Sequence, residues 1–279
     1  MAGGIGNSIA LAKASLNVLK LDKELLIFPV MSGVASILVV GSFVTPIVFA
    51  GGGQVFQEGG EAGYMAMAVM FLFYVVQYTV IFFFNSALVG AALIRLDGGD
   101  PTVGDGLAIA SKRMGSIIGY AVISATVGMI LRMISERGGI FAKLAAMFAG
   151  MAWTLATYMA VPVLVTKDIG PIDAIKESAA IFKRTWGEQV AGNFGIGWAM
   201  TLGFLAWTGI AVGLVYVSGM IAPLAILPAI GVSVLGYIFL ALLGSALSGI
   251  YTAALYRFAM TGDTGSFDAQ IMGNAFRRK

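Results

Sequence analysis

Long apolar segments recur along the chain, and short stretches between them collect most of the charged residues. A membrane-spanning helix needs about 20 mostly apolar residues. Six segments reach that length: Leu25–Ala50, Tyr64–Leu96, Gly115–Ile134, Ile140–Val165, Val190–Val217 and Pro223–Phe258. Strand-like alternation of apolar and polar residues is missing, which argues against a transmembrane barrel. The pattern therefore predicts an all-α, polytopic membrane protein, and it leaves open whether residues 223–258 form one helix or two.

We expect a single integral membrane domain over residues 1–279. It comprises an amphipathic N-terminal helix over 1–24, six transmembrane helices over 25–258 and a cytoplasmic tail over 259–279. The first apolar stretch is too long for a signal-peptide core and has no small-residue cleavage site after it, so we interpret it as an uncleaved span. With six spans, fourteen of the seventeen Lys and Arg residues lie on the side of the termini. Because cytoplasmic loops retain positive charge, both termini are predicted to face the cytoplasm from a prokaryotic plasma (inner) membrane.

The segment "AIKESAAIFKRTWGEQV", residues 174–190, has the spacing of an amphipathic helix. Apolar residues recur at intervals of four, three and four, and charged residues occupy much of the remaining surface. Pro171 fits the first helical position, where its missing N–H is not needed. We therefore predict a cytoplasmic interfacial helix carried by Ile175, Ala179, Phe182, Lys183, Arg184 and Trp186.

Both signs of charge meet in this region. From Lys167 to Glu188 there are four basic and four acidic residues, so the segment is electrically neutral. A helix that captures anionic lipids carries a basic face. The balance favours a self-paired collar that packs against other helices, while a lipid head-group receptor and a partner-docking helix remain alternatives.

Related segments precede other spans. "SLNVLKLDKE" precedes the first span, and aligning Ser15 with Ser178 places Lys20 on Lys183. A fainter copy, "DGLAIASKRMG", precedes the third span. The pattern suggests three modules, each a cytoplasmic helix followed by a transmembrane hairpin. Chance similarity among amphipathic helices is the alternative for the middle copy.

Composition excludes several kinds of chemistry. The chain is 59% hydrophobic and 11% charged, and it contains neither cysteine nor histidine. Disulfides and thiolate metal sites cannot form, and the commonest general base is missing. We therefore expect no catalytic residue, cofactor or metal and interpret the protein as not an enzyme. A net charge of +3 is too small to indicate nucleic-acid binding.

Ionisable residues are nearly absent from the predicted spans. Arg132 and Glu136 are the candidates, and their i, i+4 spacing indicates a surface ion pair. Proton relays normally use intramembrane charges that face a cavity, so a proton-driven transporter is disfavoured.

Polar uncharged residues could line a path through the membrane, and we single out Gln77, Asn85, Thr157 and Asn193. Such side chains more often hydrogen-bond across helix interfaces. Small residues at helix-packing spacing, including Gly209 with Gly213, allow close approach of helices. We expect these contacts within one chain rather than between subunits.

Three segments carry a resemblance that extends over most of the chain: "SIALAKASLNVLKLDKELLIFPV", "AIKESAAIFKRTWGEQV" and "IYTAALYRFAMTGDTGSFDAQIMGNAFRRK". With them the chain resembles an uncharacterised, DUF6159-like family of prokaryotic six-helix membrane proteins. The resemblance implies a multipass helical protein of unknown function and transfers no catalytic residue.

Two functions follow as expectations. The first is a non-enzymatic membrane protein that acts as a scaffold, lipid organiser or accessory subunit, with membrane lipids, a second copy or another membrane protein as partners. The alternative is a passive channel or transporter for a small neutral or amphipathic solute.

Overall fold

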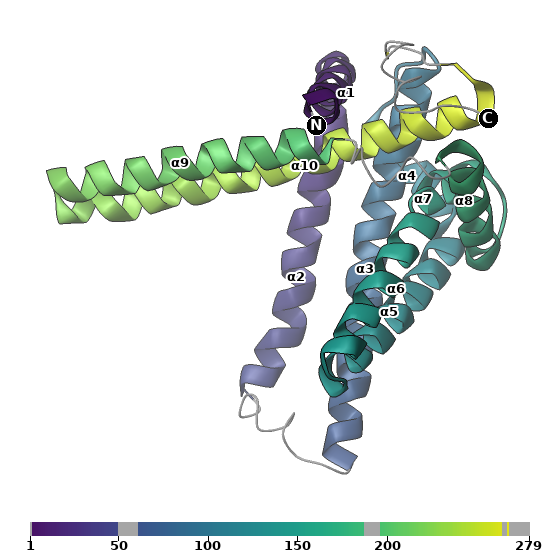
Figure 1. Ribbon diagram of the computed structural model, residues 1–279, viewed down its shortest axis with the longest axis horizontal. Coiled ribbons are helices and arrows are strands. Elements are labelled where there is room, and N and C mark those ends of the chain that lie inside the picture. Colours follow the sequence, from purple (N-terminus) through teal and green to yellow (C-terminus); the bar gives the residue numbers. More distant parts are fainter. Residues whose placement is uncertain (1, 50–60, 187–195, 264–266, 268–279) are drawn as a thin grey trace. The chain divides into compact units, whose positions relative to one another are not determined.

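The computed structural model describes residues 2–49, 61–186, 196–263 and 267, and these residues are largely helical (Figure 1). Six of the described helical segments are long and apolar enough to cross a membrane, which confirms the number of spans expected from the sequence. The α-helices are α1 (Ala2–Leu21), α2 (Ile27–Phe49), α3 (Glu61–Leu96), α4 (Val103–Lys112), α5 (Met114–Arg137), α6 (Ile140–Ala156), α7 (Ala160–Thr166), α8 (Pro171–Trp186), α9 (Gly197–Ile221) and α10 (Ile226–Thr261).

The chain divides into two compact units. The first contains Met1–Pro29, Ala92–Asp100 and Thr185–Lys279, and the second contains Val30–Ala91 and Pro101–Arg184. The boundaries fall inside α2 and α3. The first unit is therefore built on α1, α9 and α10, and the second on most of α2 and α3 with α4 to α8.

The fourth expected span is interrupted in the second unit. α6, which packs along α5, ends at Ala156, and α7 begins only at Ala160. Pro162 explains the break, because its ring clashes with the carbonyl of the residue four positions earlier, Tyr158, and supplies no N–H to the helix. The predicted continuous helix over Ile140–Val165 is therefore two helices joined by residues 157–159.

α4 begins with a reciprocal capping box. The Thr102 hydroxyl accepts a hydrogen bond from the Asp105 backbone N–H (3.2 Å), and the Asp105 carboxylate accepts one from the Thr102 backbone N–H (2.9 Å). Two free N–H groups of the first turn are satisfied in this way. The hydrogen bond from the Thr102 backbone, followed by that from its hydroxyl, lowers the pKa of Asp105 below its usual range.

The lowered pKa predicts a pH-dependent effect of Asp105→Asn. A carboxyl group with a depressed folded-state pKa contributes stability above its unfolded pKa of about 4 and loses it as pH falls through the folded value. We expect wild type to have a higher thermal unfolding midpoint than Asp105→Asn at pH 7, and the difference to shrink as the pH falls below the unfolded pKa of about 4. Circular dichroism in detergent measures both midpoints. A difference that persists at the lower pH would contradict the capping role.

α9 and α10 form a close antiparallel hairpin in the first unit (Figure 1). The Trp207 indole lies over Gly236 and donates a hydrogen bond to the Ser233 carbonyl at 3.0 Å. Met200 lies against Gly244 in the same way. Glycine is needed at Gly236 because a side chain would overlap the rigid indole ring, whereas at Gly244 an added Cβ would lie 2.8 Å from the flexible end of Met200, which can shift.

The sixth expected segment is one helix. Pro223 opens a short 3₁₀ turn over Pro223–Ala225, and α10 then continues without a break to Thr261. Pro228 lies in the first turn of α10, where its missing N–H costs no helical hydrogen bond. Gly262 ends the helix with a left-handed backbone, φ 78°, as is typical of a helix C-terminus.

α1 packs against both helices of this hairpin. Its buried stripe includes Leu11, Ser15 and Val18. The Ser8 hydroxyl accepts a hydrogen bond from the backbone N–H of Ala199 at 3.2 Å. Because the first N–H groups of α9 have no partner within their own helix, α1 stabilises the start of α9.

Candidate functional site

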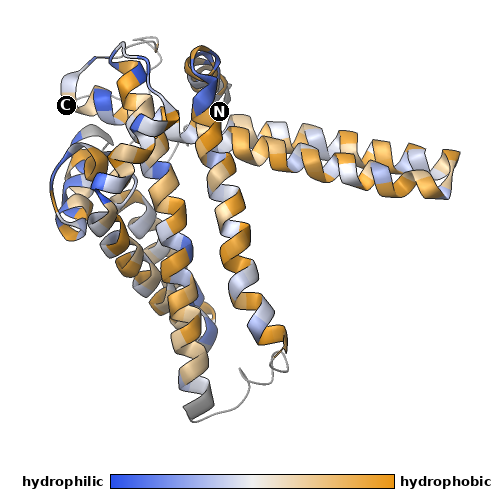
Figure 2. Ribbon diagram, turned by 180° about the vertical axis from the view of Figure 1, so that it is seen from behind, coloured by the Kyte–Doolittle hydropathy of each residue, from blue (hydrophilic) through white to orange (hydrophobic). Residues whose placement is uncertain are grey.

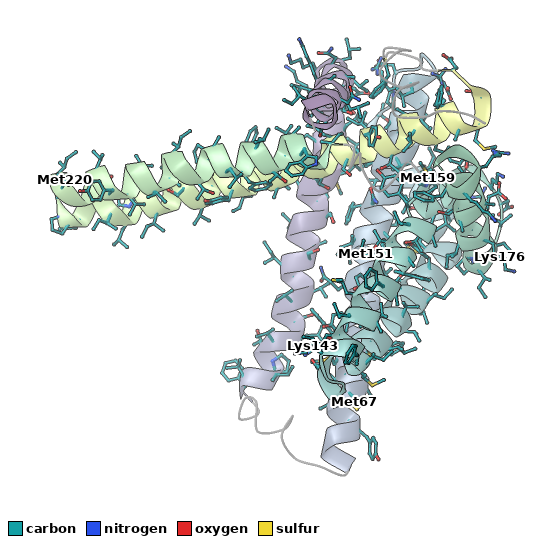
Figure 3. All side chains as sticks on the ribbon, viewed as in Figure 1. Met67, Lys143, Met151, Met159, Lys176 and Met220 are labelled. Carbon is teal, nitrogen blue, oxygen red and sulfur yellow. The ribbon has the colours of Figure 1, made fainter. Side chains whose placement is uncertain are left out.

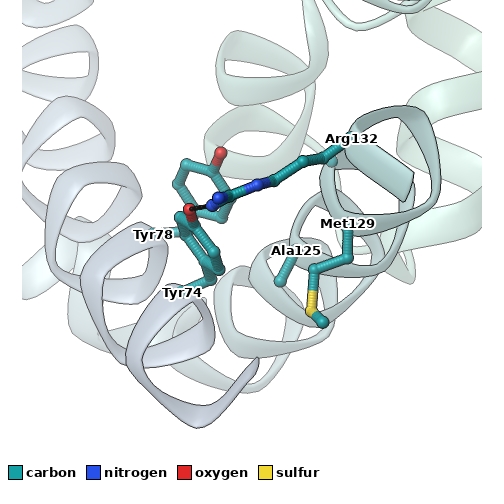
Figure 4. Close-up of a pocket in the computed structure, with 6 residues that line it drawn as sticks. Tyr74, Tyr78, Ala125, Met129 and Arg132 are labelled. Carbon is teal, nitrogen blue, oxygen red and sulfur yellow. Dashed lines mark hydrogen bonds between the residues drawn. The ribbon is translucent and has the colours of Figure 1, made fainter. Parts of the chain in front are cut away.

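A small pocket lies between α3 and α5 in the second unit (Figure 4). Its volume is about 90 Å³, and a single bound water needs only about 10–15 Å³. The pocket is therefore large enough for a small polar group. The lining residues are Tyr74 and Tyr78 of α3, with Ala125, Gly128, Met129 and Arg132 of α5.

Aromatic side chains build the α3 wall. Tyr74, Tyr78 and Phe82 are spaced four residues apart and share one face of the helix. Their rings stack in sequence, with centroids 6.1 Å apart for Tyr74 and Tyr78 and 5.7 Å apart for Tyr78 and Phe82. Phe82 continues the contact to Tyr120 of α5 at 4.5 Å. The Tyr78 hydroxyl lies beside Gly128, 3.7 Å from the position of an added Cβ.

Arg132 supplies the charge of the pocket. Its Nε donates to the Glu136 carboxylate at 2.6 Å, which confirms the ion pair expected from the i, i+4 spacing. Its Nη1 donates to the Tyr74 hydroxyl at 3.2 Å and points toward the tyrosines in Figure 4. The ion pair is half-exposed, so its contribution to stability is small.

The pocket lies near one end of both spans. A hydrocarbon thickness of about 30 Å corresponds to about 20 helical residues. Counting twenty residues along α3 from Arg95 toward the N-terminus leads close to Tyr74. Counting twenty residues along α5 from Arg113 toward the C-terminus leads close to Arg132. If Arg95 and Arg113 mark one boundary of the hydrocarbon, both counts predict that the guanidinium and the Tyr74 hydroxyl lie near the other boundary.

The four polar residues singled out in the sequence are not joined by hydrogen bonds in the described part of the chain. Thr157 donates to the Trp153 carbonyl of its own helix at 2.8 Å. Asn85 is half-buried, and the Gln77 side-chain oxygen is buried without a partner among the described residues. Asn193 lies outside the described residues. A polar path through these positions stays a prediction.

Most threonine hydroxyls of the spans, and the Ser233 hydroxyl, bond to their own helix. The donors reach the carbonyl four residues earlier, at 2.7 to 2.9 Å: Thr79, Thr126, Thr154, Thr157, Thr201, Thr208, Ser233 and Thr252. This bond satisfies a hydroxyl within its own helix. Polarity in these spans is therefore largely compensated inside single helices.

α8 buries a stripe beside the one expected from the sequence. Ala174, Ser178 and Ile181 are buried, while Ile175, Ala179 and Phe182 are only half-buried. The buried face is thus rotated by one residue, about 100°. Small side chains allow closer approach than the larger Ile175 and Phe182, and Pro171 at the start of α8 lies directly against Gly119 of α5. Lys183 and Arg184 are exposed, and the Trp186 side chain lies outside the described residues.

Ser178 explains why a hydroxyl faces inward. Its Oγ accepts a hydrogen bond from the Met159 backbone N–H at 2.9 Å, and both residues are fully buried. Met159 lies at the break between α6 and α7, where its N–H has no partner in a helix. α8 therefore supplies the acceptor that the interruption of the fourth span requires.

The charged residues around α8 pair with one another. Lys167 bonds Glu177 at 2.6 Å and Lys176 bonds Asp173 at 3.2 Å. Arg113, between α4 and α5, pairs with Asp168. Opposite charges therefore meet across this segment, as the charge count suggested.

A second ionic cluster, in the first unit, was not predicted from the sequence. Arg95 at the end of α3 pairs with the buried Asp22 at 3.2 Å and with Asp100. Arg257 of α10 pairs with Asp97 and Asp263, each at 2.8 Å. The sequence feature that could have indicated this cluster is an arginine in the last turns of an otherwise apolar helix, as in α3 and α10. The cluster ties the end of α3 to the segment that follows α1, and ties α10 to the segment that follows α3.

Metal chemistry has no visible support in the described residues, which contain no group of three or more His, Cys, Asp or Glu side chains able to hold an ion. The aspartates of the first unit instead meet arginines. The groups available to a ligand are the guanidinium and hydroxyls of the aromatic pocket.

Comparison with known proteins gives one match. Residues 64–267 match the model of a protein family described as "Family of unknown function (DUF6159)", which is more than half of the chain and runs from α3 past α10. Neither a curated protein nor a solved structure matches the chain.

Proposed function

The chain belongs to the DUF6159 family of unknown function, and from that premise we propose that it is a non-enzymatic, self-associating membrane scaffold. The observation that carries the proposal is the outward face of the α9–α10 hairpin. Large apolar side chains along it are exposed, including Leu205, Val212, Tyr216, Leu235 and Phe239. Figure 2 shows the apolar character of both helices, and Figure 3 shows side chains projecting outward as far as Met220.

α9 has two different faces. Met200 and Trp207 face α10, where each lies over a glycine. Gly209 and Gly213 lie on the opposite side of the helix, since two residues correspond to about 200°. An added Cβ at either glycine would meet no atom within 4 Å. Within the described part of the first unit, neither glycine packs against another helix.

An open pair of glycines four residues apart allows a second helix to approach closely, because packing and not hydrophobicity drives association in lipid. We assign this face to a second copy of α9. Lipid occupies the remaining apolar surface.

The charged helices support a scaffold rather than a channel. We propose that α1, α4 and α8 are interfacial helices on the cytoplasmic side, each preceding one transmembrane hairpin, with both termini in the cytoplasm of a prokaryotic inner membrane. Ser8 of α1 and Ser178 of α8 are buried and each accepts a hydrogen bond from a backbone N–H, although the two serines do not occupy equivalent positions. When Ser15 is aligned with Ser178, the buried residues Leu11 and Val18 fall on Ala174 and Ile181. This shared register supports the proposed repeat.

Two measurements on reconstituted protein test the proposal against the channel alternative. We expect glycerol flux into proteoliposomes, followed by stopped-flow light scattering, to equal that of empty liposomes. Native mass spectrometry should report a dimer, and Gly209→Leu with Gly213→Leu should convert it to a monomer because the leucines prevent close approach.

Gly41→Leu is the matched control. Gly41 of α2 is also a helical glycine with open space at its Cβ position, so the substitution tests bulk without touching the α9 face. The control should leave the dimer intact. Solute flux above the lipid background, or a dimer that survives both leucines, would reject the scaffold.

A further inference from the structure

We propose that the pocket of Tyr74, Tyr78, Gly128 and Arg132 binds a phosphate group, supplied by a phospholipid head group or by the free anion. The inference deepens the proposed function, since it names a ligand for a scaffold that must lie in lipid. Three observations carry it: unused hydrogen-bond donors, the level of the pocket along both spans, and the geometry of the Arg132–Glu136 pair.

Donors remain available in the pocket. A guanidinium has five N–H donors. Among the described residues, Arg132 directs one hydrogen bond from Nε to Glu136, one from Nη1 to Tyr74 and a long one from Nη1 to the Met70 sulfur at 3.9 Å, which leaves the Nη2 donors available. The Tyr78 hydroxyl, beside Gly128, has no hydrogen bond to a described residue. Polar groups without partners are costly next to hydrocarbon. A group with several acceptor oxygens would satisfy both side chains.

Phosphate fits these donors better than a neutral group does. Arginine binds phosphate through parallel N–H donors, and hydrogen bonds to a charged group are about twice as strong as neutral ones. By the residue counts along α3 and α5, Tyr74 stands at the level where phospholipid phosphates lie, and Tyr78 lies about one helical turn deeper. The stacked rings below them, ending in Phe82 and Tyr120, offer an apolar wall to an acyl chain.

Glu136 gives the proposal a distinctive test. In a purely structural ion pair, removing either partner has the same consequence, because each leaves the other unpaired. In an anion site, removing Arg132 and removing Glu136 have opposite effects on binding. Arg132 attracts the phosphate, whereas Glu136 competes with the phosphate for the guanidinium.

The experiment is native mass spectrometry of full-length protein in micelles doped with phosphatidylglycerol. Wild type should retain one phosphatidylglycerol per chain. Arg132→Gln should reduce retention about tenfold or more, since a hydrogen-bonded charge is lost, and Glu136→Gln should increase it. Gly128→Leu keeps both charges but fills the pocket, and it should also abolish retention.

Two controls separate the pocket from general effects. Lys143→Gln removes an exposed cation of α6 that has no aromatic pocket, and it should leave retention unchanged. Diacylglycerol with the same acyl chains but no phosphate should not be retained. Equal retention of the two lipids, or equal retention by wild type, Arg132→Gln and Gly128→Leu, overturns the inference.

A parallel arm adds inorganic phosphate to delipidated protein. If phosphate binds with the same dependence on Arg132 and Glu136 while phosphatidylglycerol is not retained, the source is the free anion and the phosphate site stands. Failure of every arm removes the site but leaves the flux and dimer measurements unaffected. The two proposals can therefore fail separately.

Discussion

Gly236→Ala is expected to destabilise the α9–α10 hairpin by about 1–3 kcal/mol. An added Cβ would lie 1.9 Å from Cζ2 of Trp207, inside the indole ring. The ring is rigid and cannot yield like the end of a flexible side chain. It must move as a whole, which also breaks its hydrogen bond to the Ser233 carbonyl.

Gly231→Ala is the matched control in the same helix. Gly231 lies in α10 with no atom within 4 Å of an added Cβ. Alanine there should be neutral or stabilising by up to about 1 kcal/mol, because glycine is the poorer helix former. Thermal unfolding in detergent, followed by circular dichroism, compares both variants with wild type. Equal midpoints for the two variants would show that α9 does not pack on α10 through Trp207.

Ser178→Ala is expected to lower the free energy of unfolding by about 1–3 kcal/mol, the loss typical of a buried donor left without a partner. The substitution removes the acceptor of the Met159 N–H and changes little else, because alanine fits wherever serine does. Met159 cannot turn to its own helix for a replacement, since Pro162 forces the break there. The loss should appear as a lower thermal midpoint and as faster hydrogen exchange of the Met159 amide.

Ser15→Ala supplies a stringent control. Ser15 of α1 is as deeply buried as Ser178, but its hydroxyl has no hydrogen-bond partner among the described residues. Its removal should leave stability unchanged or raise it, because a buried hydroxyl without a partner is unfavourable. If both serine variants lose stability equally, burial and not hydrogen bonding sets the effect, and the proposed role of Ser178 is wrong.

The spans could be predicted because lipid imposes a strong rule on sequence. Each crossing needs a long apolar helix whose backbone bonds are satisfied internally, so Leu25–Ala50 and Tyr64–Leu96 correspond to α2 and α3 within a few residues. The break of the fourth span at residues 157–159, before Pro162, was not predicted, because hydropathy stays high through it.

The candidate sites were less predictable, since they depend on contacts between distant residues. The helical periodicity of the sequence predicted α8, but it assigned Ile175 and Phe182 to the buried face. The structure buries Ala174 and Ser178 instead. Periodicity considers only how apolar a side chain is. The buried face of α8 instead includes small side chains and one hydrogen-bond acceptor. The spacing of Arg132 and Glu136 revealed their ion pair. Nothing in the sequence connected Arg132 with Tyr74, which lies 58 positions away.

The sequence by itself determined the helical class, the six spans and the pairing of charges, because the hydrocarbon thickness and the balance of charge act on short stretches of chain. The tertiary structure alone decided which faces are used. It placed Trp207 against Gly236 and left Gly209 and Gly213 open, it turned Ser178 toward Met159, and it closed the pocket of Tyr78 and Arg132. These choices depend on the relative rotation and approach of helices, and side-chain packing sets both.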